Sequence, residues 1–174
     1  MTTSAFLERT FDEPLTPEDV FRGGRESAWC FDLHRVDWHG SFLSHDGRTM
    51  ICRFSALDLE SVRLALRERN TDMSRFWSGT VYEGGGSGAP NVVVERSFAS
   101  PVRFEDVEAH EQAKAWCLEA HRVAHVRSYF SLDGKRMLCF YQAPDAEAVR
   151  IAQREAAMPV DAVWGGVLLT AQSA

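Results

Sequence analysis

The chain has few of the features that suit a protein to nucleic acids or membranes. Its 174 residues include 19 Lys and Arg against 25 Asp and Glu, a formal charge of −6, so no basic excess is available to neutralise a phosphate backbone. No apolar run approaches the roughly 20 residues that span a bilayer. Residues 1–11 lack the cationic start and apolar core of a secretory signal. We therefore expect no nucleic-acid partner, no membrane partner and, by default, a cytoplasmic protein.

Nothing in the sequence indicates an oxidising compartment, so a disulfide within each half is the less favoured use of the four cysteines. What the sequence does contain is typical of a globular protein, with 45% hydrophobic, 11% aromatic and 25% charged residues. The length allows one large domain or two small ones.

The two halves of the chain repeat one another without a gap. A shift of 87 positions superimposes Glu8-Arg9 on Glu95-Arg96, Ala28-Trp29-Cys30 on Ala115-Trp116-Cys117, and His34-Arg35-Val36 on His121-Arg122-Val123. We interpret the match as a tandem duplication with repeats at residues 1–83 and 91–174. Residues 84–90 between them are rich in Gly and Ser and lack the Gly-Lys-Ser/Thr ending of a phosphate-binding loop, so we expect a flexible linker.

Each half has the pattern strand, helix, strand, strand, helix, strand. The first strands are expected at residues 5–11 and 92–98. Thr16-Pro17-Glu18-Asp19 predicts the start of a helix that runs to about residue 34. Gly23-Gly24 lies inside this helix and costs about 1 kcal/mol per Gly relative to Ala, whereas the second half has His110-Glu111. The first copy is therefore expected to be locally weaker.

The later elements of each half are marked by turn and capping residues. Asp46-Gly47 and Asp133-Gly134 predict two-residue hairpin turns. The strands that these turns join are expected at residues 38–45 with 48–55 and 125–132 with 135–142. The second helices begin after Asp58 and Asp145, and short closing strands are expected around Trp77 and Trp164.

This order predicts an α+β fold made of two ferredoxin-like βαββαβ repeats, each with a four-stranded antiparallel sheet and both helices on one face. The other face of each sheet needs a cover, because an exposed apolar sheet face favours aggregation. We therefore expect the two sheets to pack face to face as a single-chain, pseudo-dimeric α+β barrel. The chain is expected to be a monomer with this internal pseudo-dimer, or a higher homo-oligomer of it.

Residues 126–131, residues 136–145 and Val149-Arg150 resemble the small nickel-binding-like proteins of the dimeric α+β barrel superfamily. Residues 41–44, 50–58 and 62–63 repeat this pattern in a more divergent form. The resemblance implies the barrel fold and a small-ligand or divalent-metal binding function. It does not fix the chemistry, because the superfamily also holds oxygenases, isomerases, decarboxylases and cyclases.

The resemblance has one departure that concerns metal binding. Many of these relatives place a His two residues after the Val-Arg pair of the second helix, where this chain has Ala65 and Ala152. If that His is a ligand in the relatives, their metal chemistry does not transfer cleanly to this chain.

The candidate metal ligands are cysteines and histidines four residues apart on the first helices, a spacing that brings both onto one helix face. A thiolate and an imidazole suit Zn or Ni, with a third-strand cysteine and an acid as further ligands. The alternatives are buried structural cysteines, a nucleophilic Cys-His pair, and no cofactor at all. The candidates are His34, His121, Cys30, Cys117, Cys52 and Cys139.

Glu8 and Glu95 are candidate acid-base residues, because each lies beside an arginine on a strand and one member of each pair must point inward. The neighbouring arginine, Arg9 or Arg96, can instead bind an anionic substrate. The structural alternative is a cross-strand ion pair, with Arg127 or Asp37 as the partner.

A ligand pocket is predicted in the second half. Strand alternation places His125, Arg127 and Tyr129 on one face, and Met137, Cys139 and Tyr141 on one face of the next strand. The alternative function is a cofactor-independent enzyme acting on an aromatic or polyketide-like molecule, with Glu95, His125 and Tyr141 in catalysis and Glu8 in the first copy. The expected ligand-binding residues are Arg127, Tyr129, Arg96, Met137 and Trp164, and the tryptophans are expected in the core or in a lid. A third possibility is a partner-binding protein whose second pocket is closed.

Overall fold

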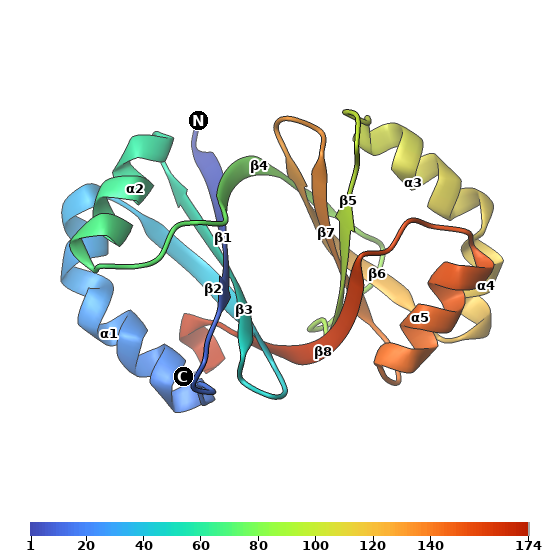
Figure 1. Ribbon diagram of the computed structural model, residues 1–174, viewed down its shortest axis with the longest axis horizontal. Helices are drawn as coiled ribbons and strands as arrows, with labels where there is room; N and C mark the ends of the chain where they lie inside the picture. Colours follow the sequence, from blue (N-terminus) through green and yellow to red (C-terminus); the bar gives the residue numbers. More distant parts are fainter. Residues whose placement is uncertain (174) are drawn as a thin grey trace. The chain divides into compact units, whose positions relative to one another are not determined.

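The computed structural model describes residues 1–173, which form eight strands and five α-helices (Figure 1). In chain order these are β1 (Thr3–Thr10), α1 (Pro17–His34), β2 (Asp37–Ser44), β3 (Thr49–Ala56), α2 (Leu59–Glu68), β4 (Phe76–Glu83), β5 (Val92–Ser97), α3 (Phe104–Ala113), α4 (Ala115–Ala120), β6 (Ala124–Ser131), β7 (Arg136–Gln142), α5 (Ala146–Glu155) and β8 (Ala162–Leu169), followed by a short 3₁₀ helix (Ala171–Ser173). The chain divides into two compact units. The first comprises Met1–Gly79 and the segment from Val167 onward, and the second comprises Thr80–Gly166.

The first unit is an antiparallel sheet in the order β4-β1-β3-β2, covered on one face by α1 and α2 (Figure 1). Along β1 the alternate residues Ala5 and Leu7 face the helices and pack in the core with Cys30, Val62 and Leu66. The amphipathic alternation of β1 therefore determines which face of the sheet the helices cover.

The second unit repeats this arrangement in the order β8-β5-β7-β6, with α3, α4 and α5 on one face of the sheet (Figure 1). Its helix-facing core includes Val94, Cys117, Cys139 and Val149. The pairing registers of the two units agree residue for residue. Arg9 pairs with Met50 in β1 and β3, and Arg96 pairs with Met137 at the corresponding position of β5 and β7.

The first helix differs between the units in a way that the two glycines do not predict. Helix α1 is continuous through Gly23 and Gly24, and it begins with a capping box between Thr16 and Asp19. Its counterpart has no side-chain cap at Arg103 and is interrupted between α3 and α4. Because a capping box satisfies two otherwise unpaired backbone donors, α1 has a stabilised start that α3 lacks.

The hairpin tips are longer than predicted. The strands end at Ser44 and resume at Thr49, so four residues rather than two connect them. The Ser44 hydroxyl accepts hydrogen bonds from the backbone N–H groups of Arg48 and Thr49, which holds the wider loop. Gly47 has φ +73°, as the Asp-Gly pattern predicts. The predicted helix caps are confirmed, since Asp58 and Asp145 each accept a hydrogen bond from a backbone N–H of the first turn.

The predicted alternation along β6 is wrong at its start, because a β-bulge lies between His125 and Arg127. The bulge adds one residue and changes which side chains share a face. His125 therefore pairs with the helix-facing Tyr141, whereas Arg127 and Tyr129 pair with Phe140 and Leu138 on the other face.

The Gly-rich segment is anchored rather than loose along its first part. The backbone N–H of Gly84 donates to the Val126 carbonyl at 2.8 Å, and that of Gly86 donates to the His125 carbonyl at 2.8 Å. A Cβ at Gly84 would lie 2.3 Å from the His125 carbonyl oxygen. Glycine at this position therefore permits a close approach to the bulge.

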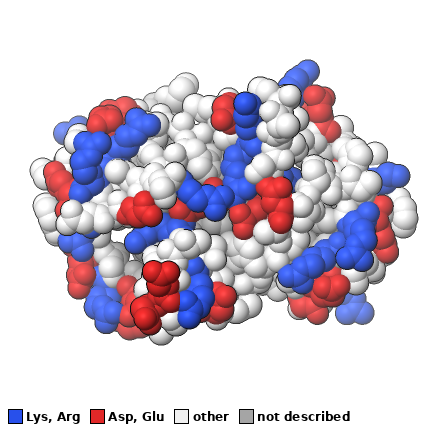
Figure 2. All heavy atoms as spheres, in the orientation of Figure 1, with Lys and Arg blue, Asp and Glu red and all other residues white. Residues whose placement is uncertain are grey.

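The expectation that the tryptophans lie in the core or in a lid is wrong for Trp29 and Trp116, which are exposed on the first helices of the two units. No helix among residues 1–173 is long and apolar enough to cross a bilayer. On the face shown in Figure 2, basic and acidic side chains are interspersed.

Candidate functional site

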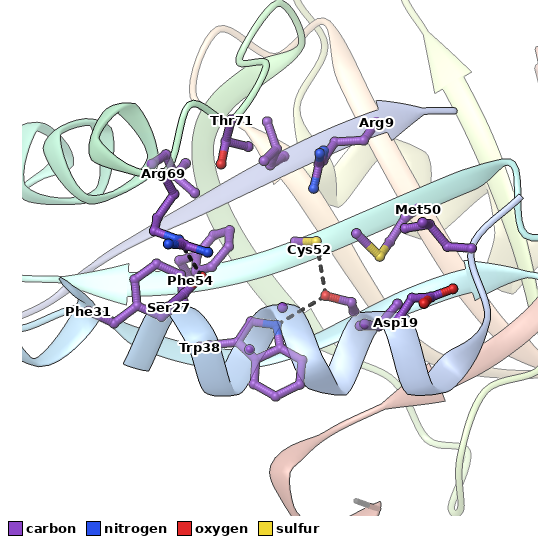
Figure 3. A pocket seen from close by; sticks show the side chains of 17 residues that line it. Arg9, Asp19, Ser27, Phe31, Trp38, Met50, Cys52, Phe54, Arg69 and Thr71 are labelled. Atoms are coloured by element: carbon purple, nitrogen blue, oxygen red, sulfur yellow. Dashed lines mark hydrogen bonds between the residues drawn. The ribbon is translucent and has the colours of Figure 1, made fainter. Parts of the chain in front are cut away.

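The first unit contains a cavity of about 220 Å³ between α1 and the helix-facing side of its sheet (Figure 3). We call it the first-unit pocket and define it by Arg9, Gly23, Gly24, Trp38, Ser41, Cys52, Phe54 and Arg69. Most of the remaining lining is apolar and includes Leu7, Phe31 and Met50. Apolar walls with a few polar groups are typical of small-molecule sites.

The floor of the pocket carries a short hydrogen-bond chain. The Trp38 indole N–H donates to Ser41 Oγ at 3.0 Å, and the Ser41 hydroxyl donates to Cys52 Sγ at 2.9 Å (Figure 3). Burial raises the pKa of the Cys52 thiol to about 11, and the Ser41 hydrogen bond only partly opposes this rise. Cys52 is therefore a neutral thiol at pH 7 and part of the floor, and it does not join the Cys30–His34 pair as the third metal ligand that the sequence predicts.

Two arginines give the pocket its charge, and both side chains reach toward it in Figure 3. Arg9 stacks over Phe11, with its Cζ 4.8 Å from the ring centroid, and makes no ion pair with any residue in the described range 1–173. Arg69 donates to Ser27 Oγ at 3.1 Å and lies 3.6 Å from a carboxylate oxygen of the exposed Glu26.

The acid that lines the pocket is already engaged. Asp19 accepts from the backbone N–H and hydroxyl of Thr16, and those hydrogen bonds hold the pKa of its carboxyl below the usual value. Asp19 also pairs with Arg22. The pocket therefore presents positive charge to its interior.

Gly23 and Gly24 open the pocket on the helix side. A Cβ at Gly23 would meet no atom within 4 Å, and one at Gly24 would meet only Trp38 Cζ3, at 4.0 Å. Neither residue has a positive φ. No steric constraint in the described structure therefore requires glycine at positions 23 and 24. Each glycine lowers the stability of the helix, and the absence of side chains here leaves empty space.

The corresponding region of the second unit is filled by a polar cluster. Arg96 is fully buried and donates to Gln153 Oε1 at 2.7 Å, to the Pro159 carbonyl at 2.6 Å and to the Tyr141 hydroxyl at 3.1 Å. The Tyr141 hydroxyl donates to Glu111 Oε2 at 2.7 Å, and that oxygen lies 3.5 Å from Arg96 Nη2. The space lined by Glu111 and His125 is only about 20 Å³.

Burial sets the protonation of this cluster. It raises the pKa of Tyr141 well above 10, and the neighbouring Glu111 carboxylate adds to the rise. Burial lowers the pKa of His125, whose imidazole lies 5.5 Å from the Tyr141 ring and hydrogen-bonds Ser128 Oγ at 2.7 Å. Tyr141 is therefore a protonated donor and His125 is neutral at pH 7.

A larger hollow of about 500 Å³ in the second unit is lined by Val102, His110, Met158 and neighbouring loop and helix residues. No strand residue contributes to its lining. It therefore lies outside the helix-to-sheet space that corresponds to the first-unit pocket.

The candidate acid-base residues Glu8 and Glu95 lie on the opposite faces of the sheets from the helices. Glu95 accepts from the Trp164 indole at 2.7 Å and pairs with Arg136 at 2.5 Å. Glu8 accepts in the same way from Trp77 at 2.8 Å and lies 3.5 Å from Arg75. Both carboxylates thus have ion-pair partners, but these are not the Arg127 or Asp37 that the sequence suggests.

The structure brings together some of the predicted second-half residues and separates others. Tyr141, His125, Met137 and Cys139 share the helix-facing side, as does Arg96. Glu95 does not, because it is adjacent to Arg96 and points the other way. Arg127 pairs with Glu83 at 3.0 Å, and Tyr129 packs on Phe140, both away from this cluster.

A possible metal-binding group occurs in the first unit. Among the described residues, Cys30, His34 and Glu68 place one ligand atom each within 4.8 Å of one another. Cys30 Sγ donates to Glu68 Oε2 at 3.2 Å, and His34 Nε2 lies 3.1 Å from Glu68 Oε1. Glu68 is the acid that the sequence argument lacked.

The second unit keeps only part of this arrangement. His121 Nε2 lies 3.0 Å from Glu155, at the positions that match His34 and Glu68, but Cys117 does not complete a group within residues 1–173. All four cysteines are free and buried.

Of the residues that define the first-unit pocket, only Arg9 and Cys52 are candidate site residues in the sequence. Gly23-Gly24 was visible as a weak point of a helix, but its consequence depends on Trp38, Ser41 and Arg69, which come from other elements. The signal that points to the site is the difference between the repeats at positions 23–24 and 110–111.

Residues 93–165 match the model of the family described as nickel responsive protein SCO4226-like, a match over less than half of the chain. The comparison with curated proteins found no significant match. The chain is similar to that family in its second half, which agrees with the resemblance seen in the sequence.

Solved structures show the same fold at low identity. A mutant chlorite dismutase from Candidatus Nitrospira defluvii aligns with a TM-score of 0.55 and 13% identity, covering 96% of this chain and 91% of the other. The putative chlorite dismutase TA0507 gives 0.52 and 11%, covering 96% and 93%. An anthrone oxidase-like protein gives 0.51 and 10%, covering 97% and 91%. These likenesses establish the dimeric α+β barrel class of fold and leave activity open.

Proposed function

We propose that this chain binds a small organic molecule with an apolar body in the first-unit pocket. The observation that carries the proposal is the cavity of about 220 Å³ behind Gly23 and Gly24, two residues that weaken α1 without being required by its backbone. Residues that lower local stability are expected mainly at sites where function requires them. The aromatic and aliphatic walls supply affinity for the apolar body.

The test is a screen of small aromatic and aliphatic carboxylic acids, each paired with its primary amide. Binding is followed by the ¹⁵N-HSQC signal of the Trp38 indole N–H, which lies in the pocket floor. Gly24→Leu fills the pocket and is expected to remove binding. Gly85→Leu is the matched control, because a Cβ at Gly85 meets nothing within 4 Å and the residue lies outside the pocket. The proposal fails if nothing shifts this signal, or if binding survives Gly24→Leu.

A divalent metal at Cys30, His34 and Glu68 is the second candidate. Thiol, imidazole and carboxylate within 4.8 Å of one another are ligands that suit Zn or Ni. Burial and the neighbouring Glu68 raise the pKa of the Cys30 thiol, so a metal has to displace its proton. The residues fit as a partial site. The family description that names nickel responsiveness matches residues 93–165 and does not cover these three residues.

Titration with Ni²⁺ and Zn²⁺, followed by native mass spectrometry, tests this candidate. One ion per chain is expected, lost in Cys30→Ser and kept in His121→Gln, the matched histidine of the second unit. Retention of the ion in Cys30→Ser, or no ion at all, contradicts it.

The enzymatic alternative gains no support from geometry, since Glu95 lies on the opposite face of the sheet from Tyr141. The tandem duplication and the face-to-face packing of its two sheets into a pseudo-dimeric barrel stay proposals. So do a cytoplasmic location and the oligomeric state.

A further inference from the structure

In both units, side chains at matching positions line the space between the first helix and the sheet. Arg9 and Arg96 occupy equal register positions opposite Met50 and Met137. Trp38 and His125 do so as well, since each pairs with the residue of the next strand that faces the helices. The side chains that fill this space in the second unit therefore indicate which chemical groups the corresponding space of the first unit can bind.

In the second unit the filling group is the carboxylate of Glu111. It comes from α3 at the position that matches Gly24, and it meets the Arg96 guanidinium at 3.5 Å and the Tyr141 hydroxyl at 2.7 Å. His110, at the position of Gly23, hydrogen-bonds the Ala156 carbonyl at 3.0 Å. The buried arginine thus receives its counter-charge from its own first helix.

The first unit keeps the arginine and lacks the carboxylate. Gly24 provides no side chain, and Phe54 and Leu66 replace the polar partners Tyr141 and Gln153. A second cation, Arg69, stands where the second unit has Ala156. The first-unit pocket therefore lacks the carboxylate that pairs with the arginine of the second unit, and it has a second cation.

We propose that the ligand of the first-unit pocket carries a carboxylate, which pairs with Arg9 as the Glu111 carboxylate pairs with Arg96. This inference rests on the proposed function and names its substrate class as small amphipathic carboxylic acids. The apolar body of the ligand lies against the aromatic and aliphatic walls. Charge-assisted pairing with a guanidinium selects the acid over a neutral compound of equal shape.

A double-mutant cycle tests the geometry without any ligand. Gly24→Glu supplies the missing carboxylate, and Gly24→Gln supplies the same bulk without charge. The melting temperature of Gly24→Glu is expected to exceed that of Gly24→Gln, and the difference is expected to vanish in an Arg9→Gln background. Gly85→Glu and Gly85→Gln are the matched control pair and should not differ. Equal melting temperatures of the two Gly24 variants would overturn the inference.

The acid and amide pairs test the ligand class. Acids are expected to bind at least about tenfold more tightly than their amides, with the preference lost in Arg9→Gln and kept in Arg25→Gln, because Arg25 and its partner Glu18 both lie outside the pocket. If amides bind as tightly as acids, the proposed function stands and the carboxylate inference is wrong. If neither class binds, both are wrong.

Discussion

Replacing Gly23 and Gly24 with alanine should stabilise the protein. Both residues lie inside α1 with room for a Cβ, and Ala is favoured over Gly in a helix interior by about 1 kcal/mol per residue. The double variant should therefore gain about 2 kcal/mol. In a chain of this length that corresponds to a rise in melting temperature of about 4 to 8 °C. Differential scanning calorimetry measures the rise.

The matched control is Gly47→Ala, for which the opposite sign is expected. Gly47 has φ +73°, and a Cβ there would lie 2.3 Å from the Leu15 carbonyl oxygen. Left-handed backbone alone costs a non-glycine residue about 1 to 2 kcal/mol, so this variant should melt at a lower temperature. If the double alanine variant of α1 is destabilised instead, the glycines are structurally required, and the argument that they exist to leave space is refuted.

Three further predictions concern stability. Burial holds the pKa of His125 below 6.5. The contribution of the neutral His125 side chain to the free energy of unfolding is therefore complete above pH 6.5 and is lost as the pH falls below 6.5. Urea unfolding between about pH 5 and 7 should show this loss in the wild type and a flatter profile in His125→Gln. Asp58→Ala and Asp145→Ala should each cost about 1 kcal/mol in the same assay, because each removes a helix cap. Glu111→Ala should cost about 2 to 3 kcal/mol, because it removes the counter-charge of the buried Arg96; a cost below that of the cap variants contradicts the proposed network.

Much of the fold could be predicted because its signals are local. Thr16-Pro17 marks the start of α1, Asp58 and Asp145 cap their helices, and Asp-Gly pairs lie at both hairpin tips. The bulge in β6 could not be predicted, since no turn residue marks it and a one-residue insertion reverses the alternation that follows. That reversal separates His125 from Arg127.

The candidate sites were harder to predict, because their members come from elements far apart in the sequence. The four-residue spacing of Cys30 and His34 was informative, since a helix brings such residues onto one face. Glu68, which completes that group from α2, is unmarked in the sequence. Cys52, which the sequence suggests as a third ligand, instead accepts a hydrogen bond from Ser41 in the floor of the first-unit pocket.

The order of residues alone determined the repeated pattern of strands and helices, since periodicity, caps and turn residues act within a few positions of one another. Tertiary structure decided the rest, because the partner of a buried charge is set by packing. Arg9 and Arg96 occupy matching positions. Arg96 pairs with a carboxylate from the first helix of its unit, whereas Arg9 lines a cavity. That difference depends on whether a side chain of the first helix, such as Glu111, reaches the arginine on the sheet. Such a contact between separate elements exists only in the folded protein.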